Sequence, residues 1–460
     1  MKALEFARRV LFWTADFIKG GNVRKHFKDI KFIQGNPNSP KALKCRNEHL
    51  ERLLEHAVKS VPYYKDLMGE HRSKLEHFPI VDKTIIRENY KKFTSGSYLD
   101  KHKHEVSTSG STGNPFKLLQ NKGKRERNIA DTIFFSKRAG FELGARLYYL
   151  RLWDKQYKKS GLLSKIQNID MQSVDDLNDK SLHDWIARYE KDGSTKNILA
   201  YNSALRSVCQ YLNKINAVPL KCKTNSVIAM AEGMDDYVRQ GIKRYFNIEP
   251  LSRYSNSENG IIGQQFYGSH DFEINEASYY VEILDLNRDI PVKSGESGRI
   301  VITDLFNYCM PMIRYDTGDV GKVQRSESGR FVFTAIEGRK MDMFTNTDGE
   351  FVSSHIIHHI LQFEGIDQFQ FVEEDDNNYT IKLKVNDNFD LNNESKVIEK
   401  YKVYFGENAQ ILVEYVSDIP LLLSGKRKLV INNAINKQNA KKKMSDQQAH
   451  VDRYDLESSK

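Results

Sequence analysis

Hydrophobic positions along the chain follow two periods, one typical of helices and one typical of strands. Between residues 46 and 61 apolar side chains recur at helical spacing, and Pro62 closes the pattern. After residue 115, apolar extended runs alternate with helical segments. The extended runs are 116–120, 146–153, 197–201 and 226–230, and the helical segments are 124–139, 182–190, 204–213 and 235–246. This βα alternation predicts a largely parallel sheet covered by helices.

The pattern changes twice outside this region. The stretch 154–180 is polar and is predicted to be a surface excursion, whereas strand patterns joined by turns predict a β subdomain after residue 270. From about residue 339 two helical and three extended segments predict a compact α+β domain. We therefore expect an α/β protein with a large domain over 1–338, a small domain over 339–440 and a disordered basic tail over 441–460.

Composition narrows the class of protein. Hydrophobic residues make up 39% of the 460 residues, and no segment approaches the about 20 consecutive apolar residues of a spanning helix. The four cysteines stand far apart, which predicts free thiols in a reducing, cytoplasmic compartment. The formal net charge is +9, but no nucleic-acid recognition motif accompanies the basic runs. We expect a polar, soluble protein without a nucleic-acid partner.

The first residues leave two interpretations open. Apolar side chains between residues 4 and 18 are interleaved with Lys2, Arg8, Arg9 and Lys19. Such a segment predicts an amphipathic helix. It either packs on its own domain or makes peripheral contact with an anionic membrane, to which the basic tail could also bind.

A loop rich in hydroxyl groups and glycine stands out within residues 105–116. Glycines permit positive φ, so successive backbone N–H groups can point into one concavity, and hydroxyls add further donors for phosphate oxygens. Asn114 and Pro115 follow the last glycine, which excludes the Lys-Ser/Thr of the common nucleotide P-loop. The candidate phosphate-binding residues are Ser107, Thr108, Ser109, Gly110, Ser111, Thr112 and Gly113.

Four more candidate sites follow along the chain. Glu258, beside Ser257, has the carboxylate that Mg²⁺ requires, and Asp319, expected where a hydrophobic strand over 311–319 ends, could accept ribose hydroxyls. Arg339 follows a glycine at the domain junction, a place suited to phosphate contact and hinge motion. Lys426 lies on a glycine-containing loop that could deliver a cation to a transferring phosphoryl group. Each of these motifs alone is also compatible with a solvated turn.

In their order along the chain the five motifs resemble the adenylate-forming superfamily of acyl-CoA synthetases, luciferases and peptide-synthetase adenylation domains. The sequence is most similar to the branch of phenylacetate–CoA ligases and CapK-type capsular polysaccharide proteins. That similarity includes Phe78-Pro-Ile-Val-Asp-Lys, Ala231-Glu-Gly-Met and the run 280–319, and it covers roughly residues 45–432.

The resemblance implies a two-step ligase that uses ATP and Mg²⁺. A small carboxylic acid would form an acyl-adenylate, and CoA or another acceptor would then take the acyl group. The context that the branch implies is capsular or surface polysaccharide biosynthesis. Residues 107–113 would bind the β- and γ-phosphates, Ser257 the α-phosphate, Glu258 Mg²⁺ and Asp319 the ribose. Arg339 would contact the nucleotide, and Lys426 would stabilise the adenylation transition state.

The resemblance also implies that the small domain rotates between the two steps. The hinge would comprise Arg339, Lys340, Met341 and Asp342. Near the predicted strand ends, we expect the acid pocket to include Tyr201, Ala231, Gly233, Ser255 and Asn256. The sequence departs from the family pattern twice, since Asn114 replaces a lysine and Met341 replaces an aspartate.

Two other functions remain open at this point. The first is acyl transfer to a carrier or a sugar without CoA. The second is a non-catalytic scaffold that binds a membrane or a polyanion.

Overall fold

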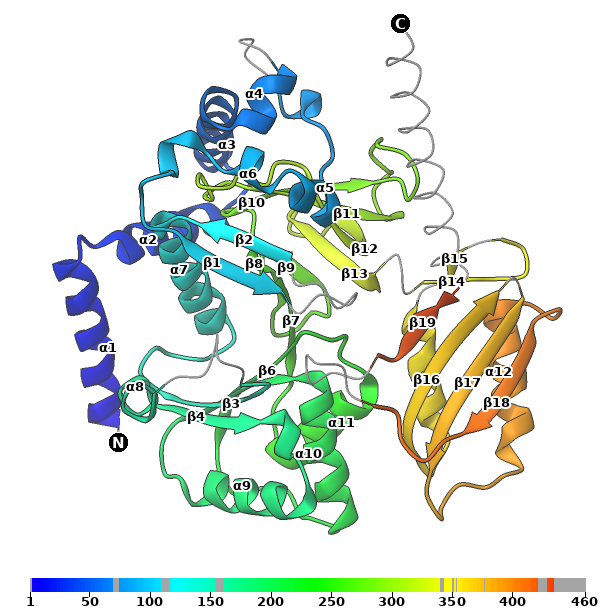
Figure 1. The fold of residues 1–460 in the computed structure, drawn as a ribbon. Helices are drawn as coiled ribbons and strands as arrows, with labels where there is room; N and C mark the ends of the chain where they lie inside the picture. Colours follow the sequence, from blue (N-terminus) through cyan, green and yellow to red (C-terminus); the bar gives the residue numbers. More distant parts are fainter. Residues whose placement is uncertain are drawn as a thin grey trace, which may run out of the picture. The chain divides into compact units, whose positions relative to one another are not determined.

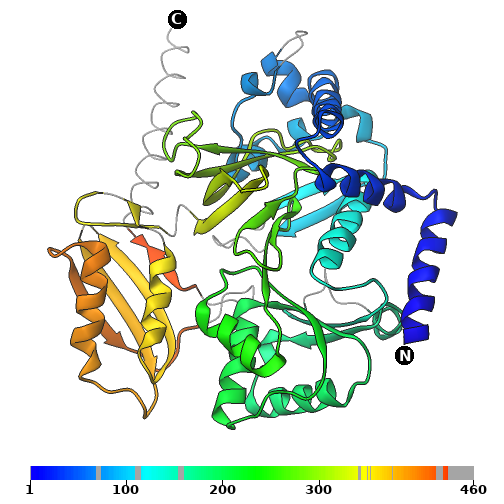
Figure 2. The same cartoon turned by 180° about the vertical axis from the view of Figure 1, so that it is seen from behind.

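The computed structural model describes residues 2–68, 74–108, 116–153, 160–339, 343–349, 351–352, 354–375, 377–420 and 428–433. The chain forms two compact units, Met1–Ile336 and Glu337–Lys460 (Figures 1 and 2). This division falls beside the predicted boundary after residue 338. The predicted disordered tail lies outside the described residues.

An eleven-stranded sheet runs through the first unit, in the order β10-β11-β12-β13-β9-β8-β7-β6-β5-β3-β4. Its strands are β3 (Arg146–Arg151), β4 (Ile169–Ser173), β5 (Lys196–Tyr201), β6 (Thr224–Met230), β7 (Leu251–Asn256), β8 (Gly260–Gln265), β9 (Phe272–Ile274), β10 (Tyr279–Leu284), β11 (Ser297–Asp304), β12 (Tyr315–Arg325) and β13 (Phe331–Arg339). Strands β4, β3, β5, β6 and β7 are parallel neighbours, and the pairing becomes antiparallel from β7 to β8. The predicted parallel sheet and β subdomain are therefore two halves of one sheet.

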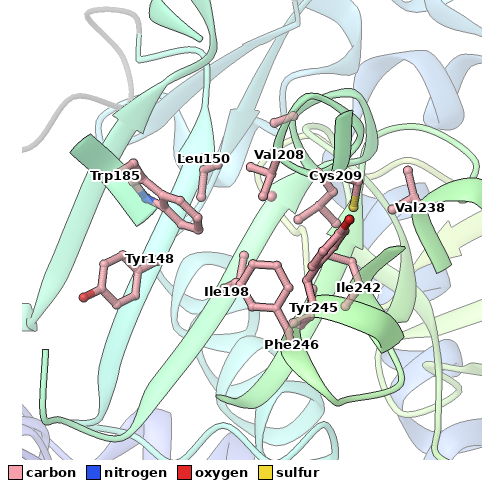
Figure 3. Packing of buried hydrophobic residues seen from close by; sticks show 14 of the residues in the cluster. Tyr148, Leu150, Trp185, Ile198, Val208, Cys209, Val238, Ile242, Tyr245 and Phe246 are labelled. Carbon is pink, nitrogen blue, oxygen red and sulfur yellow. The ribbon is translucent and has the colours of Figure 1, made fainter. Parts of the chain in front are cut away.

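The parallel half is covered by the helices that connect its strands. These are α9 (Asp179–Lys191), α10 (Asn202–Lys214) and α11 (Asp236–Phe246). Trp185, Val208 and Tyr245 from these helices pack against Leu150 and Ile198 of the sheet, and all five side chains are almost fully buried (Figure 3). Parallel strands buried in this way appear as short apolar runs in a sequence, which is why the sequence pattern identified them.

The first hundred residues of this unit are helical. They form α1 (Lys2–Ile18), α2 (Asn22–Gly35), α3 (Pro40–Ser60), α4 (Pro62–Met68), α5 (Lys83–Glu88), α6 (Tyr90–Phe93) and the short 3₁₀ turns η1 (Leu75–His77) and η2 (Gly96–Tyr98). Ser39 caps α3 by accepting a hydrogen bond from the backbone N–H of Ala42 at 3.3 Å. Pro62 ends the helical pattern of α3, as predicted, and is the first residue of α4.

A separate antiparallel pair lies at the start of the βα region. It consists of β1 (His104–Thr108) and β2 (Phe116–Gln120), followed by α7 (Lys122–Arg138). The second unit has the strand order β18-β17-β16-β19, a small sheet on which α12 (Asn393–Phe405) and η5 (Ser354–Gln362) pack around Phe371 and Tyr401. Its strands are β14 (Phe344–Thr345), β15 (Phe351–Val352), β16 (Ile366–Asp375), β17 (Asn378–Val385), β18 (Gln410–Tyr415) and β19 (Val430–Asn432).

Two predictions about local structure were wrong. The stretch 154–180 is not only an excursion, because it contains α8 (Gly161–Gln167), the edge strand β4 and the turn η3 (Val174–Asp176). Asp319 does not end a strand but lies inside β12, which begins at Tyr315. Arg314 has a positive φ of 49°, and this left-handed conformation keeps the apolar residues 311–313 out of the strand.

Candidate active site

The strands that flank the predicted phosphate loop form a regular hairpin. Thr108 and Phe116 are paired at its end, and the register continues to His104 opposite Gln120. Ser107 is half-buried on β1. Residues 109–115, which include Ser109, Gly110, Ser111, Thr112, Gly113 and Asn114, lie outside the described residues. The hairpin therefore fixes where both ends of this loop attach.

Glu258 lies in the tight turn between β7 and β8. Glu258 is only 2% exposed. Its Oε1 forms an ion pair with the Lys83 ammonium at 2.7 Å and accepts a hydrogen bond from the Tyr315 hydroxyl at 3.0 Å. Burial, followed by the charge of Glu258, raises the pKa of Tyr315 well above its ordinary value, so the hydroxyl remains a donor at neutral pH. Lys83 is one-third exposed and also lies over the Phe116 ring, 5.9 Å from its centre. Helix α5, strand β2 and the β7–β8 turn therefore meet at this carboxylate.

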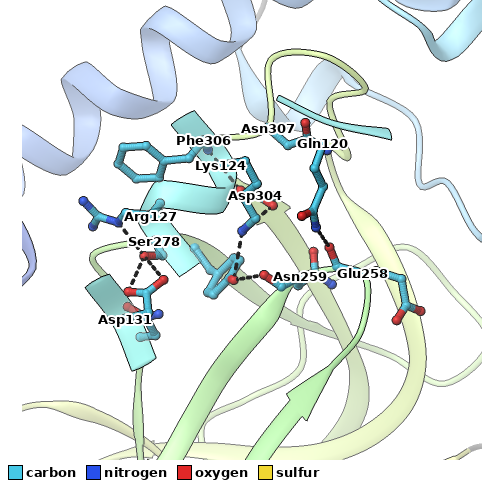
Figure 4. Close-up of polar contacts among 12 residues, drawn as sticks. Gln120, Lys124, Arg127, Asp131, Glu258, Asn259, Ser278, Asp304, Phe306 and Asn307 are labelled. Atoms are coloured by element: carbon cyan, nitrogen blue, oxygen red, sulfur yellow. Dashed lines mark hydrogen bonds and ion pairs between the residues drawn. The ribbon is translucent and has the colours of Figure 1, made fainter. Parts of the chain in front are cut away.

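A buried polar network lies beside the turn and supports it (Figure 4). Gln120 of β2 donates to the carbonyl oxygen of Glu258 at 2.9 Å, which ties the phosphate-loop hairpin to the turn. Lys124 of α7 pairs with Asp304 at 2.7 Å, and neither side chain is exposed to solvent. Lys124 also donates to the Tyr279 hydroxyl at 3.1 Å, and that hydroxyl donates to the carbonyl oxygen of Asn259. The backbone carbonyls of Glu258 and Asn259 are thus held by β2 and, through Tyr279, by α7.

Asp319 is coupled to the same turn through a second tyrosine. Tyr254 of β7 donates its hydroxyl to Asp319 Oδ2 at 2.6 Å. Burial and the neighbouring Asp319 carboxylate raise the pKa of Tyr254 well above its ordinary value, and Glu258 contributes to the same shift. Two tyrosine–carboxylate pairs, Tyr254–Asp319 and Tyr315–Glu258, therefore lie within electrostatic range of one another. The structure brings these two carboxylates, which are distant in sequence, into one site.

The predicted pocket residues lie at the carboxyl ends of three neighbouring parallel strands. Tyr201 ends β5 and is buried, and it pairs with Met230 at the end of β6. Ala231 follows β6 with a positive φ of 71°. Gly233 comes two residues later, and Ser255 and Asn256 end β7. Ligands of open α/β sheets bind at this edge, so the placement agrees with a binding role for these residues.

Ser257 lies beside Glu258 in the β7–β8 turn and is exposed, and Arg339 is exposed at the end of β13, where the second unit begins. Lys340, Met341, Asp342 and Lys426 lie outside the described residues. The carboxylates and the hairpin thus form the part of the candidate site that the structure describes.

Sequence reasoning missed four side chains of this site: Lys83, Gln120, Tyr254 and Tyr315. Lys83 lies in a motif that carried the family resemblance, so a signal existed, but nothing local linked it to a carboxylate 175 residues away. Each of the two tyrosines stands four residues before a predicted carboxylate, Tyr254 before Glu258 and Tyr315 before Asp319. Their roles depend on pairing between strands that the sequence alone does not specify.

The described residues contain one group of three possible metal ligands: Asp29 on α2, and Cys45 and His49 on α3. Cys45 Sγ and Asp29 Oδ1 lie 3.6 and 3.3 Å from His49 Nε2. However, Arg127 binds the other Asp29 oxygen, and Arg52 donates to His49 Nδ1, both at 2.5 Å. Both nitrogens of His49 and both oxygens of Asp29 therefore have partners within the protein. The cluster is satisfied without a metal, and we assign it to helix packing.

The candidate active site is suited to binding and stabilising charged groups rather than to covalent catalysis. Glu258 has a carboxylate of the kind that Mg²⁺ binds, and Lys83 already places a cation beside it. Asp319 is half-buried and oriented by Tyr254, which suits the recognition of hydroxyl groups. Together with a hairpin that presents a hydroxyl- and glycine-rich loop, this arrangement fits a phosphorylated nucleotide.

Comparison with known proteins agrees with this geometry. Residues 344–433 match the CapK C-terminal domain family. Protein CapK of Staphylococcus aureus is 22% identical over 442 residues, which cover 91% of this chain and 94% of that protein. Phenylacetate-coenzyme A ligase of Escherichia coli K12 is 23% identical over 350 residues, which cover 69% of this chain and 76% of that enzyme.

A solved structure shares the fold. The structure of 2-hydroxyisobutyryl-CoA ligase in the postadenylation state, in complex with 2-HIB-AMP, superposes with a TM-score of 0.67 at 16% identity and covers 89% of this chain and 93% of that one. The predicted α/β fold with a small C-terminal domain is therefore confirmed. The chain is a relative of CapK and phenylacetate-CoA ligase, with the fold of the adenylate-forming ligases and a CapK C-terminal domain over residues 344–433.

Proposed function

We propose that this protein is an ATP-dependent, AMP-forming acid ligase. The observation that carries the proposal is that Glu258 and Asp319 belong to one coupled site. Tyr315 and Tyr254 hold the two carboxylates, and Gln120 ties the Glu258 turn to the phosphate-loop hairpin. The relatives named as CoA ligases support CoA as the acyl acceptor. The similarity to CapK supports a role in surface polysaccharide biosynthesis.

In the proposed reaction the carboxylate of a small acid attacks the α-phosphorus of ATP. An acyl–phosphate bond forms, the bond between the α-phosphorus and the bridging oxygen breaks, and pyrophosphate leaves with that oxygen. The acceptor, as a thiol for CoA, then attacks the acyl carbon and releases AMP. The protein contributes position and charge rather than a covalent intermediate.

Each site residue then has a definite task. Asp319, held by Tyr254, orients the ribose, and residues 107–113 bind the β- and γ-phosphates. Glu258 would hold Mg²⁺, which supplies charge neutralisation when bound, while Lys83 adds positive charge beside the phosphates. Residues 201, 231, 233, 255 and 256 line the acid pocket. Arg339 contacts the nucleotide, with residues 339–342 as the hinge, and Lys426 stabilises the charge that develops during adenylation.

The acid and the location are further parts of the proposal. The acid is small, because the resemblance is to a branch that activates small carboxylates. The four cysteines are free thiols, two of them buried, which supports a cytoplasmic location.

The direct test is ATP–pyrophosphate exchange with a panel of aryl, fatty, hydroxy and amino acids. We expect exchange with at least one acid, and Lys426→Ala should lower its rate by ~10²–10³-fold, the scale for removal of one transition-state donor. Lys428→Ala is the matched control, since Lys428 is in the same basic segment and its described contact uses only its backbone carbonyl. Exchange that Lys426→Ala leaves unchanged would remove Lys426 from the mechanism.

The acceptor needs a separate measurement. AMP release that accelerates with CoA supports the thioester product, whereas acceleration by a carrier or a sugar without CoA supports the alternative acceptor. A protein that binds ATP but exchanges pyrophosphate with no acid would not be a ligase.

A further inference from the structure

Helix α1 is attached to the first unit by its polar side chains. Glu5 is 9% exposed and accepts a hydrogen bond from the backbone N–H of Thr195 at 2.9 Å. Asp16 is 8% exposed and accepts from the backbone N–H groups of Val23 and Arg24 at 3.1 and 3.0 Å. These bonds join α1 to the residue before β5 at one end and to α2 at the other. The rotation of α1 about its own axis is therefore fixed.

The opposite face of α1 is apolar and exposed to solvent. At about 100° per residue, its large apolar side chains and the small residues between them form one arc of about 160°. The large side chains are 47–78% exposed: Leu4, Phe6, Val10, Leu11, Phe17 and Ile18. Surface helices normally turn such a stripe toward the protein core. Here acids face the protein and apolar groups face solvent.

Helix α8 extends this apolar surface. It lies beside the N-terminal end of α1 (Figures 1 and 2), and Gly144 contacts both helices. Asn168, which caps α8, donates to the carbonyl oxygen of Gly144 at 3.2 Å, and a Cβ on Gly144 would lie 2.3 Å from the Glu5 carbonyl oxygen. The exposed large apolar side chains of α8 are Leu162 at 72%, Ile166 at 50% and Leu163 at 42%. We call the nine large apolar side chains of α1 and α8 the α1–α8 face.

The exposed charges of the N-terminal segment that contains α1 have one sign. Residues 2–47, all described by the structure, contain three acidic residues, and Glu5, Asp16 and Asp29 are each buried or half-buried and hydrogen-bonded. In the same segment the exposed charged side chains are Lys2, Lys19, Arg24, Lys25, Lys28, Lys31, Lys41 and Lys44. Glu142, the acid that pairs with α1, is already neutralised by Arg9 at 3.3 Å. An apolar stripe whose own segment exposes only cations is complementary to anionic headgroups above an acyl layer.

We propose that the α1–α8 face docks this protein on an anionic phospholipid bilayer, as a peripheral contact. None of the helices among the described residues is long and apolar enough to cross a membrane, so the contact is with the surface. A second copy of the chain is a poorer occupant, because pairing the two faces would bring two sets of exposed cations together. The proposal does not depend on the ligase activity.

The test is co-sedimentation of the full chain with vesicles. We expect binding to vesicles of phosphatidylcholine mixed with phosphatidylserine, weaker binding to phosphatidylcholine alone, and loss of binding as salt screens the charges. Leu11→Ser combined with Phe17→Ser should lower the partition coefficient roughly tenfold or more, since two large apolar side chains no longer enter the acyl layer. Val218→Ser is the matched control, because Val218 is 70% exposed but lies between α10 and β6.

Charge reversal tests the second half of the proposal. Lys25→Glu combined with Lys28→Glu should reduce binding to the anionic vesicles about tenfold or more, since each basic group near such a surface contributes to attraction. Equal binding by the wild type and the Leu11→Ser/Phe17→Ser variant would overturn the proposal. The proposal would also be overturned if the wild type sediments as a dimer without lipid and the Leu11→Ser/Phe17→Ser variant sediments as a monomer. Exchange activity without vesicles should be the same in wild type and variant, which separates this result from the test of the ligase.

Discussion

The buried ion pair between Lys124 and Asp304 gives a quantitative test of the network beneath the site. Both side chains have no exposed surface, and Lys124 lies 2.7 Å from its partner. Replacing Lys124 with methionine keeps most of the volume but leaves the Asp304 carboxylate buried without its counter-charge. Breaking such a pair typically costs about 3–5 kcal/mol, so we expect the free energy of unfolding of the first unit to fall by that amount.

A double variant separates charge from packing. Lys124→Met combined with Asp304→Asn removes both charges, while an amide oxygen can still accept the hydrogen bond that Asp304 Oδ1 receives from the backbone N–H of Phe306 at 3.0 Å. We expect the double variant to recover most of the lost stability. Lys122→Met is the matched control on the same helix. Lys122 is 71% exposed and pairs with Glu126 at 3.7 Å, so its loss should cost no more than about 1 kcal/mol.

Tryptophan fluorescence in urea is a suitable assay. The three tryptophans are Trp13, Trp153 and Trp185, and all belong to the first unit. The signal therefore follows that unit without a contribution from the second. A loss for Lys124→Met no larger than that for Lys122→Met would refute the reasoning, as would a double variant that is even less stable than Lys124→Met.

Three further predictions concern other parts of the chain. Burial and the nearby Arg127 lower the pKa of His26 to about 4 from 6.5, so the unfolded chain protonates His26 more readily than the folded chain does. The free energy of unfolding should therefore fall by about 3 kcal/mol at most as the pH drops from 6.5 to 4. Urea titrations should show this fall in the wild type but not in His26→Gln. Tyr254→Phe removes the hydrogen bond that orients Asp319; we expect the KM for ATP in the exchange assay to rise about fivefold, on the scale of one hydrogen bond, with little change in Tm. Gly365→Ala should destabilise the second unit strongly, because φ is +84° and a Cβ would lie 2.3 Å from the Phe389 backbone nitrogen. Gly349→Ala, with φ +79° and open space around it among the described residues, should cost only about 1–2 kcal/mol. Hydrogen–deuterium exchange of β16 measures the effect of both substitutions.

Much of the fold could be predicted from the sequence because its signals are local. The parallel strands around Ile198 and Val227 are short apolar runs, and the helices between them repeat apolar residues at helical spacing. Strand β4 has no such signal. Its five residues are all half-buried, as expected for an edge strand, so neither face produces an alternating pattern.

The candidate site was predictable in part for the same reason. Glu258 and Asp319 stand in recognisable motifs, but Lys83 and Gln120 act through contacts with residues far along the chain. The error over Asp319 arose because one left-handed residue, Arg314, delays the strand. A single backbone angle of that kind leaves no hydrophobic pattern to detect.

The strand order of the large sheet has a consequence for synthesis of the chain. Strand β9 pairs with β8 on one side and with β13 on the other, although β13 is made almost sixty residues later. Until Phe331 and the residues after it leave the ribosome, β9 and β12 each present an open edge of unpaired backbone groups. Such edges are where growing chains associate wrongly. Chains that stop before β13 should therefore aggregate, whereas chains that stop after it, without the rest of the small unit, have every internal edge of this sheet closed.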